Sequence, residues 1–236
     1  MNQILITEKL YVTPELKKKK KIYQFAFLIS IICVFCLSFC YVYAEIDRNN
    51  REKVSQEILA GIDDTTVNED DSILRVSLEA DEQEQNVIIE ENNDGNNENK
   101  YVTQNGQSYT TDAVLNIPSL GINYPILSET SEELLKISLN KFWGPSPNEV
   151  GNYCIVGHNY KNKKMFGKLS SIKNGDIVEL TDNSGKTIKY AVYNKYVVEP
   201  DDVSCTSQLT NGNKEVTLIT CTNYGKQRLV VKARQV

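Results

Sequence analysis

The chain has 236 residues, of which 40% are hydrophobic and 24% are charged, and its formal net charge is -5. This length predicts one domain or two, and six cysteines are too sparse for a disulfide scaffold. The net negative charge argues against a nucleic-acid-binding protein, and twelve glycines with six prolines exclude collagen-like chains. Charge is unevenly distributed, and it divides the chain into segments 1–21, 22–44, 45–100 and 101–236.

Residues 22–44 form a run of uncharged, mostly apolar residues, and this is the first predicted element. A helix of this length spans roughly 34 Å, enough for a bilayer core of about 30 Å. The tail before it, residues 1–21, contains six lysines and two glutamates, and residues 17–21 are all lysine. Because basic flanks stay cytoplasmic, the pattern predicts a single-pass anchor in the cell membrane, with a cytoplasmic N-terminus and an extracellular remainder.

A cleaved signal peptide is the alternative, because Val42-Tyr43-Ala44 resembles a cleavage site. The apolar run exceeds the roughly 7 to 15 residues of a signal-peptide core, which favours an uncleaved anchor. Cys33 and Cys36 form a C-x-x-C pair within the run. Inside a bilayer we interpret them as small apolar residues rather than as a redox or metal motif.

Residues 45–100 are polar, with 17 acidic and five basic side chains and a low-complexity stretch at 92–99. Such a composition buries too little apolar area to offset the entropy of ordering the chain. It predicts a disordered acidic spacer with a reach of roughly 40 Å. A short helix is an alternative over residues 51–59.

Residues 101–236 have the length of a typical folded domain and are rich in short β-type patterns. Ala113, Leu115 and Ile117 alternate with polar residues, as in a half-buried strand. Further strands are predicted at 153–156, 177–180, 188–193, 196–198, 216–220 and 229–233. Many short strands separated by turns predict a mainly β barrel or sandwich.

One helix is predicted from about Ser131 to Leu139, because Thr130 and Glu133 have the spacing of a capping box. A single helical turn is predicted at 165–169.

The candidate site combines three residues of this domain. His158 is the only histidine of the chain and follows a predicted strand and Gly157. Cys221 ends one strand of a predicted hairpin and Arg228 begins the next, so the two face each other. A guanidinium beside a thiol favours the nucleophilic thiolate and can stabilise an oxyanion. Each residue alone is more often structural, but together they indicate an acyl-transfer site.

The stretch TLITC at 217–221, with Arg228 downstream and VGHN at 156–159, resembles the sortase family over about residues 112–236. The resemblance implies a closed eight-stranded β-barrel cysteine transpeptidase of the Gram-positive cell surface, preceded by a transmembrane helix. It implies that Cys221 forms an acyl-thioester with a sorting-motif peptide similar to Leu-Pro-x-Thr-Gly. His158 would exchange protons with the leaving and incoming amines, and Arg228 would hold the substrate backbone and the oxyanion. The acceptor would be a peptidoglycan cross-bridge amine or a pilin lysine.

The segment between Val198 and Glu215 is short, and the spacer lacks an Asp-Pro-x-aromatic lid. The short segment argues against subclasses that carry a long helical insertion there. The missing lid favours an anchoring enzyme, class B- or D-like, over a pilin-type one. Two alternatives remain open, namely a thiol peptidase or hydrolase that uses the same three groups, and a catalytically inactive binding module on a tether.

No metal or other cofactor is predicted. Asp201 and Asp202 could join Glu149 in a Ca²⁺ site such as some sortases have, but a solvated acidic loop is the favoured interpretation. A single histidine excludes a typical zinc site. Cys154 and Cys205 could pair outside the cell, although a buried free thiol is favoured at Cys154.

Overall fold

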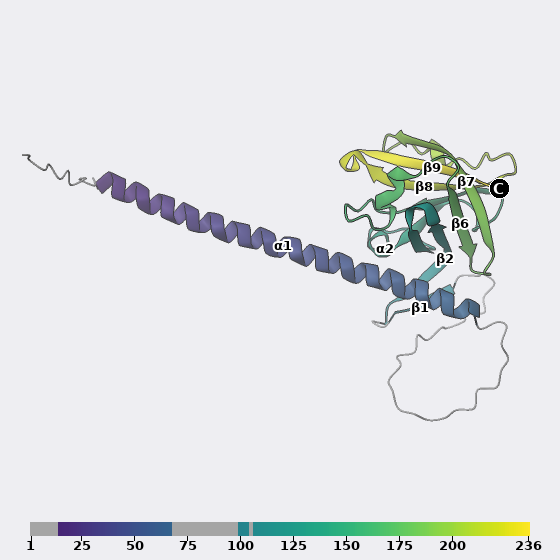
Figure 1. The fold of residues 1–236 in the computed structure, drawn as a ribbon, viewed down its shortest axis with the longest axis horizontal. Helices are drawn as coiled ribbons and strands as arrows, with labels where there is room; N and C mark the ends of the chain where they lie inside the picture. Colours follow the sequence, from purple (N-terminus) through teal and green to yellow (C-terminus); the bar gives the residue numbers. More distant parts are fainter. Residues whose placement is uncertain (1–13, 68–98, 104–105) are drawn as a thin grey trace, which may run out of the picture. The chain divides into compact units, whose positions relative to one another are not determined.

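The computed structural model describes residues 14–67, 99–103 and 106–236. The chain forms two compact units, one ending at Asn49 and the other covering Asn50–Val236. The second unit holds the end of the long helix and all of the strands (Figure 1).

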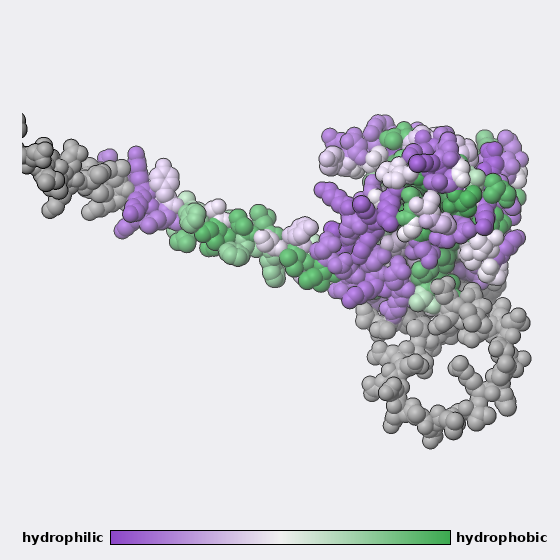
Figure 2. Space-filling view, viewed as in Figure 1, coloured by the Kyte–Doolittle hydropathy of each residue, from purple (hydrophilic) through white to green (hydrophobic). Residues whose placement is uncertain are grey.

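The helix α1 (Pro14–Val67) contains the apolar run predicted to span a membrane. Among the described residues it is the one helix long and apolar enough to do so, with a mean hydropathy of 2.6 in its most apolar part. Figure 2 shows this part as a hydrophobic stretch flanked by hydrophilic side chains. Its large apolar side chains are exposed, as a lipid-facing surface requires.

The helix does not end at Ala44 but continues to Val67, so residues 45–67 of the expected spacer are helical. Val54, Ile58 and Ile62 recur at helical spacing, and the barrel covers this face, which leaves Ile58 and Leu59 buried. The composition of residues 45–100 did not reveal this amphipathic stripe, because acidic residues dominate the segment. Residues 68–98 of the expected spacer, and residues 1–13 of the basic tail, lie outside the described residues.

The second unit is built on one antiparallel-rich sheet. Its strands are β1 (Asn99–Val102), β2 (Ser108–Ile117), β3 (Ile122–Leu127), β4 (Leu139–Trp143), β5 (Gly151–Val156), β6 (Ile177–Asp182), β7 (Thr187–Val198), β8 (Lys214–Thr222) and β9 (Gln227–Gln235). Their order is β1-β2-β3-β4-β5-β8-β9-β7-β6, and pairing of β2 with β6 closes the sheet. The eight strands from β2 to β9 thus form the predicted closed barrel, and β1 is added along the first half of β2.

Apolar side chains from alternate strand positions fill the barrel. Ala113, Leu115 and Ile117 are at most 1% exposed, which confirms the alternation expected for β2. Tyr153 is buried with them, and its hydroxyl donates to Asp112 Oδ2 at 3.0 Å. Burying each large aliphatic side chain stabilises the fold by about 1.5–3 kcal/mol.

Three strands and one helix boundary differ from the sequence expectations. β1 was not expected, and its first two residues lie in the expected spacer. β3 and β4 were not expected, because Pro125 interrupts the first and the second begins where the helix was expected to continue. The helix α2 is shorter (Glu132–Ile137), and Ser131 is its N-cap, with a hydroxyl that accepts from Leu134 N–H. Thr130 instead donates to the Lys141 carbonyl.

The predicted strands at 188–193 and 196–198 are one strand, β7, with an irregularity between Val192 and Asn194. Short 3-10 turns complete the fold, namely η1 (Pro118–Leu120), η2 (Phe166–Ser171), η3 (Ser204–Thr206) and η4 (Asn223–Gly225). The helical turn expected at 165–169 corresponds to η2.

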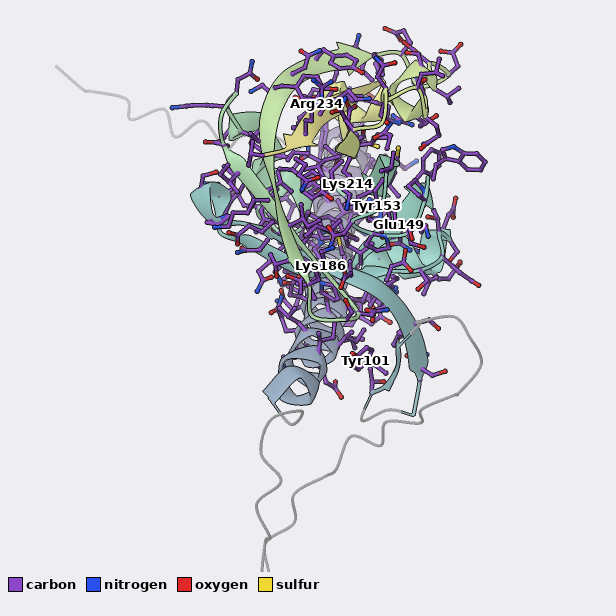
Figure 3. The ribbon with its side chains drawn as sticks, turned by 90° about the vertical axis from the view of Figure 1, so that its right-hand side faces the viewer. Tyr101, Glu149, Tyr153, Lys186, Lys214 and Arg234 are labelled. Atoms are coloured by element: carbon purple, nitrogen blue, oxygen red, sulfur yellow. The ribbon has the colours of Figure 1, made fainter. Side chains whose placement is uncertain are left out.

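The end of α1 packs on the barrel in a separate apolar cluster. Its buried members are Ile58, Tyr101, Tyr109, Leu127 and Ile137. Tyr101, labelled in Figure 3, lies beside the last turns of α1, where a β-carbon at Gly61 would come within 3.3 Å of its ring. A polar contact accompanies the cluster, since the Ser55 hydroxyl donates to Ser138 Oγ at 3.1 Å.

Candidate active site

The strands that lead to His158 and Cys221 run side by side in parallel. The last pair of the β5–β8 ladder is Val156 with Ile219. His158 comes two residues after Val156, and Cys221 comes two residues after Ile219. Both therefore reach the same rim of the barrel. The Asn159 side-chain amide donates to the Cys221 carbonyl at 2.8 Å, which ties the His158 loop to the end of β8.

Gly157, directly before His158, lies where no side chain fits. A β-carbon at this position would overlap the side chains of Leu139 and Phe166. The Gly157 carbonyl also accepts from Thr220 Oγ1 at 2.7 Å. This close packing fixes the backbone from which His158 projects.

Arg228 is the direct cross-strand partner of Cys221 in the antiparallel β8–β9 ladder. Side chains of such a pair leave the same face of the sheet, with β-carbons about 4.5–5.5 Å apart. Arg228 Nη1 donates to the carbonyls of Gly225 (2.9 Å) and Gln227 (3.2 Å). No carboxylate of the described residues pairs with this guanidinium, so its charge is available to a ligand.

The turn between these strands is strained. Asn223, Tyr224 and Gly225 all have positive φ, at 49°, 56° and 86°. Left-handed backbone costs a non-glycine residue about 1–2 kcal/mol. The turn closes the hairpin immediately next to Cys221 and Arg228, and such strain is typical of functional sites.

The His158 imidazole is partly buried and packs against Tyr160, with ring centroids 5.0 Å apart. Burial lowers the pKa of His158 below its usual value, and the Lys136 ammonium lowers this pKa further. The neutral imidazole, which can accept a proton, is therefore favoured at neutral pH.

The three cysteines of the second unit differ in accessibility. Cys221 is exposed, whereas Cys154 and Cys205 are buried free thiols. Burial raises the pKa of Cys154 to about 12 and also raises that of Cys205. Because the thiolate is the nucleophile, Cys221 is the reactive candidate of the three.

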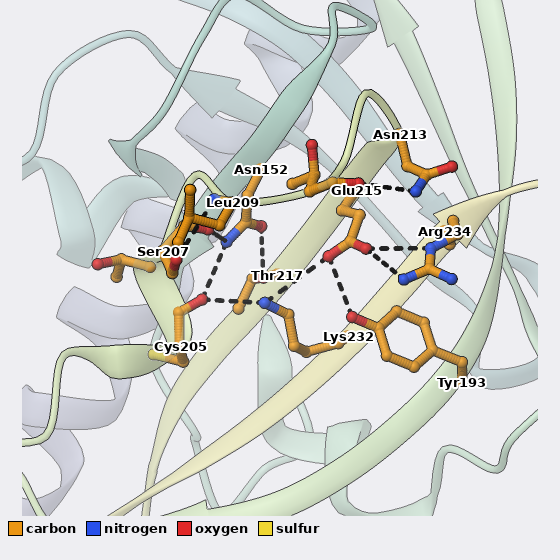
Figure 4. A network of polar contacts seen from close by, with 12 residues as sticks. Asn152, Tyr193, Cys205, Ser207, Leu209, Asn213, Glu215, Thr217, Lys232 and Arg234 are labelled. Carbon is orange, nitrogen blue, oxygen red and sulfur yellow. Dashed lines mark hydrogen bonds and ion pairs between the residues drawn. The ribbon is translucent and has the colours of Figure 1, made fainter.

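The loop before β8 is held against the barrel by a polar network centred on Asn152 (Figure 4). The Asn152 amide donates to the carbonyls of Cys205 (2.9 Å) and Ser207 (3.1 Å), and its oxygen accepts from Thr217 Oγ1 (2.6 Å). Lys232 Nζ also donates to the Cys205 carbonyl at 3.1 Å. Asn152 has only a weak signal in the sequence, a polar residue within an apolar strand, and was not among the predicted site residues.

An apolar surface lies under this loop beside the reactive end of β8. Ile219, two residues before Cys221, leaves the same face of the strand. Its accessible part is formed by the partly buried residues Val156, Tyr196 and Val198, which pack against the buried residues Cys205, Ile219 and Val230. These partly buried side chains are the ones that an apolar ligand can contact.

The acidic residues considered for Ca²⁺ do not gather. Among the described residues, no group of three or more His, Cys, Asp or Glu side chains is placed to hold a metal ion. Asp202 instead caps its own loop by accepting from Ser204 N–H at 2.9 Å.

A closed β-barrel with a thiol, an imidazole and a guanidinium on one rim defines a protein class suited to thiol-mediated acyl transfer. A family model described as "Sortase domain" matches residues 115–236, which is more than half of the chain. The chain belongs to the sortase family. The match covers the whole barrel except the start of β2.

Individual sortases show the same relationship. Sortase A of Bacillus anthracis is 33% identical over 113 residues, which cover 45% of this chain and 50% of that protein. The chain thus spans about half the length of this curated relative. The structure of sortase A from Corynebacterium diphtheriae is 29% identical and covers 54% of this chain and 61% of that one, with a TM-score of 0.50. A pilus-related sortase C of Group B Streptococcus is 27% identical, covers 53% and 67%, and has a TM-score of 0.50.

Proposed function

We propose that this chain is a membrane-anchored cysteine transpeptidase that cleaves a sorting-motif peptide and transfers it to an amine. The observation that carries the proposal is the shared rim, where the parallel β5–β8 pair delivers His158 and Cys221 and the β8–β9 register adds Arg228. Family membership gives the same reaction type as an expectation.

In the first half-reaction, Cys221 Sγ attacks the threonine carbonyl of an LPxTG-like motif as its proton passes to His158. Arg228 stabilises the oxyanion that develops on the carbonyl. The peptide C–N bond then breaks, and the imidazolium returns the proton to the leaving amine. The product is a thioester on Cys221.

In the second half-reaction, an incoming amine attacks the thioester and His158 accepts its proton. The new amide forms, and Cys221 leaves as a thiolate that regains the proton. The acceptor is a peptidoglycan cross-bridge amine. With water as acceptor, the same steps give slow hydrolysis.

Recognition and location complete the proposal. The partly buried side chains of Val156, Tyr196 and Val198 receive the apolar part of the motif beside the thiol. Residues 22–44 cross the membrane once, with the lysine-rich tail cytoplasmic and the barrel extracellular. The role is anchoring of secreted surface proteins by a class B- or D-like enzyme, because the sequence before the barrel lacks the Asp-Pro-x-aromatic lid of a pilin-type enzyme.

The test uses the full chain in detergent micelles with a panel of sorting-motif peptides, with and without an added oligoglycine amine. Mass spectrometry should detect an acyl adduct that is absent from Cys221→Ala, and a ligated product that increases with amine. Cleavage without ligation at any amine concentration would indicate the thiol hydrolase instead. No adduct, together with a Cys221 inert to iodoacetamide, would indicate the inactive binding module.

A further inference from the structure

Hydrogen bonds connect the end of α1 to the loop that carries His158. Tyr124, on β3, donates its hydroxyl hydrogen to Glu52 Oε1 of α1 at 2.7 Å. The same hydroxyl oxygen accepts from the Met165 backbone N–H at 3.1 Å. Glu52, Tyr124 and Met165 all belong to the second unit.

Met165 closes the His158 loop. The Phe166 N–H donates to the His158 carbonyl at 3.0 Å, and Asn159 and Met165 form an isolated antiparallel bridge. The two ends of the loop are therefore tied together directly beside the imidazole. Movement of Met165 would move His158 with it.

Met165 also has an unfavourable backbone. Its φ is 48° and its side chain is 1% exposed. A positive φ in a buried non-glycine residue persists only where its surroundings hold it. A buried N–H needs an acceptor, and here the Tyr124 hydroxyl is that acceptor.

Glu52 determines which way the Tyr124 hydroxyl points. A phenol hydroxyl has one hydrogen to donate. When that hydrogen is bonded to the carboxylate, a lone pair of the hydroxyl oxygen points to the Met165 N–H. Burial raises the pKa of Tyr124, and the hydrogen bond to Glu52 adds to that rise, so the phenol stays protonated. The donor and the acceptor sides of this hydroxyl are both used.

We propose that Tyr124 and Glu52 are positioning residues that hold the His158 loop in its catalytic conformation, so that the end of α1 is part of the active-site scaffold. The inference rests on the proposed function in one respect only, the role of His158 in proton transfer. The contacts themselves are independent of that role.

The kinetic test compares variants of the full chain in detergent micelles. Tyr124→Phe leaves the Met165 N–H without its acceptor, and we expect kcat to fall about tenfold while KM for the peptide stays within about twofold. Glu52→Ala should lower kcat in the same way, and Glu52→Gln, which keeps an acceptor oxygen, should restore most of it.

Matched controls separate positioning from general packing. Tyr109→Phe removes a hydroxyl from another buried tyrosine of the α1 contact, one bonded only to Gln107 in the described contacts. Lys53→Ala changes the exposed neighbour of Glu52. Both should keep the wild-type kcat.

A second readout needs no substrate. Because His158 is the only histidine, its imidazole gives the only histidine signals in an NMR spectrum of the chain purified without a histidine tag. Tyr124→Phe and Glu52→Ala should shift or broaden these signals, and Tyr109→Phe should leave them unchanged. An unchanged His158 signal in Tyr124→Phe overturns the inference, whatever happens to kcat. If Tyr124→Phe does not fold, Glu52→Ala decides in the same way.

The two proposals fail separately. If the wild-type chain ligates no peptide, the proposed function fails, while the histidine signals still decide whether Tyr124 and Glu52 hold the loop. If the wild type is active and Tyr124→Phe has the same kcat and the same histidine signals as the wild type, only the positioning role fails.

Discussion

Arg228 differs from the other basic residues of β9 in what its guanidinium contacts. Arg234, on the same strand, forms an ion pair with Glu215 at 2.7 Å. Arg228 bonds only to carbonyls of its own turn within the described contacts, and it faces Cys221 across the ladder. Arg234 therefore connects β9 to β8, and the guanidinium of Arg228 remains available to contact a ligand.

We expect Arg228→Lys to lower kcat/KM about 10²-fold, because lysine keeps the charge but cannot present a planar fork of donors to an oxyanion. Arg234→Lys is the matched control and should change kcat/KM less than about twofold. Steady-state peptide ligation by the full chain measures both. Equal losses in the two variants would contradict a specific role for Arg228.

His158 also links stability to pH. Because burial lowers its pKa in the folded state, the unfolded chain binds a proton first as the pH falls. The free energy of unfolding should therefore decrease as the pH drops below about 6.5, and level off below the folded-state pKa. His158→Gln should lack this component.

Urea unfolding of both proteins at pH 7.5 and 5.5 makes the comparison. Titration of carboxylates affects both chains alike, so the difference between their pH dependences isolates the histidine. Parallel pH profiles for the wild type and His158→Gln would contradict the prediction, because they would mean that the imidazole has the same pKa in the folded and the unfolded chain.

At the scale of elements, the loop before β8 depends on one buried amide. Asn152 is fully buried and bonds Cys205, Ser207 and Thr217. We expect Asn152→Ala to lower the free energy of unfolding by about 2–4 kcal/mol, since several polar groups lose their partner. It should also raise KM for the peptide, because the loop borders the apolar surface beside Cys221.

Asn116→Ala is the control for that experiment. Its amide makes one partly buried bond, to Glu179 at 2.8 Å, on the β2–β6 side of the barrel. The expected loss is about 0.5–1.5 kcal/mol, with KM unchanged. Urea denaturation and ligation kinetics measure both variants. An equal change of KM in the two variants would mean that the loop before β8 has no specific role in peptide binding.

The elements differ in how far the sequence predicted them. Period-two alternation revealed β2. Runs of apolar, β-branched and aromatic residues revealed β5 to β9, because these strands contribute most of their apolar side chains to buried clusters. β4 was not predicted, because its parallel pairing with β3 involves two residue pairs only and neither strand has a local sequence signal. The helix over residues 45–67 was predicted only in part, as the alternative of a short helix over 51–59, because its stripe of apolar residues needs the barrel to cover it.

The candidate site divides in the same way. His158, Cys221 and Arg228 carry reactive groups in a recognisable motif, and the structure brings all three to one rim. Tyr124, Glu52 and Asn152 act through hydrogen bonds to residues distant in the sequence. No local pattern marks such residues, and they emerge only from the tertiary contacts.

At the scale of the molecule, the end of α1 belongs to the second unit and shares its apolar packing. A chain truncated to residues 99–236 loses Ile58 and Leu59 and uncovers Tyr101 and Tyr109. Since each buried aliphatic side chain contributes about 1.5–3 kcal/mol, we expect a loss of roughly 3–6 kcal/mol as an upper value.

The matched control is a chain that begins at Asn50 and keeps this helix end while lacking the apolar run. Urea unfolding followed by tryptophan fluorescence reports on both chains through the single tryptophan, Trp143. Equal unfolding midpoints for the two chains would mean that the α1 contact contributes little to stability.

The parallel pairing of β5 with β8 also has a kinetic consequence. The contact between Asn159 and Cys221 joins residues 62 positions apart, with two further strands between them in the sequence. Pairings between distant segments form late, because the entropy of loop closure opposes them. The hairpin that pairs Cys221 with Arg228 is local, whereas the Cys221 thiol has no imidazole near it until β5 pairs with β8. Recovery of activity on refolding would therefore mark the late pairing of β5 with β8.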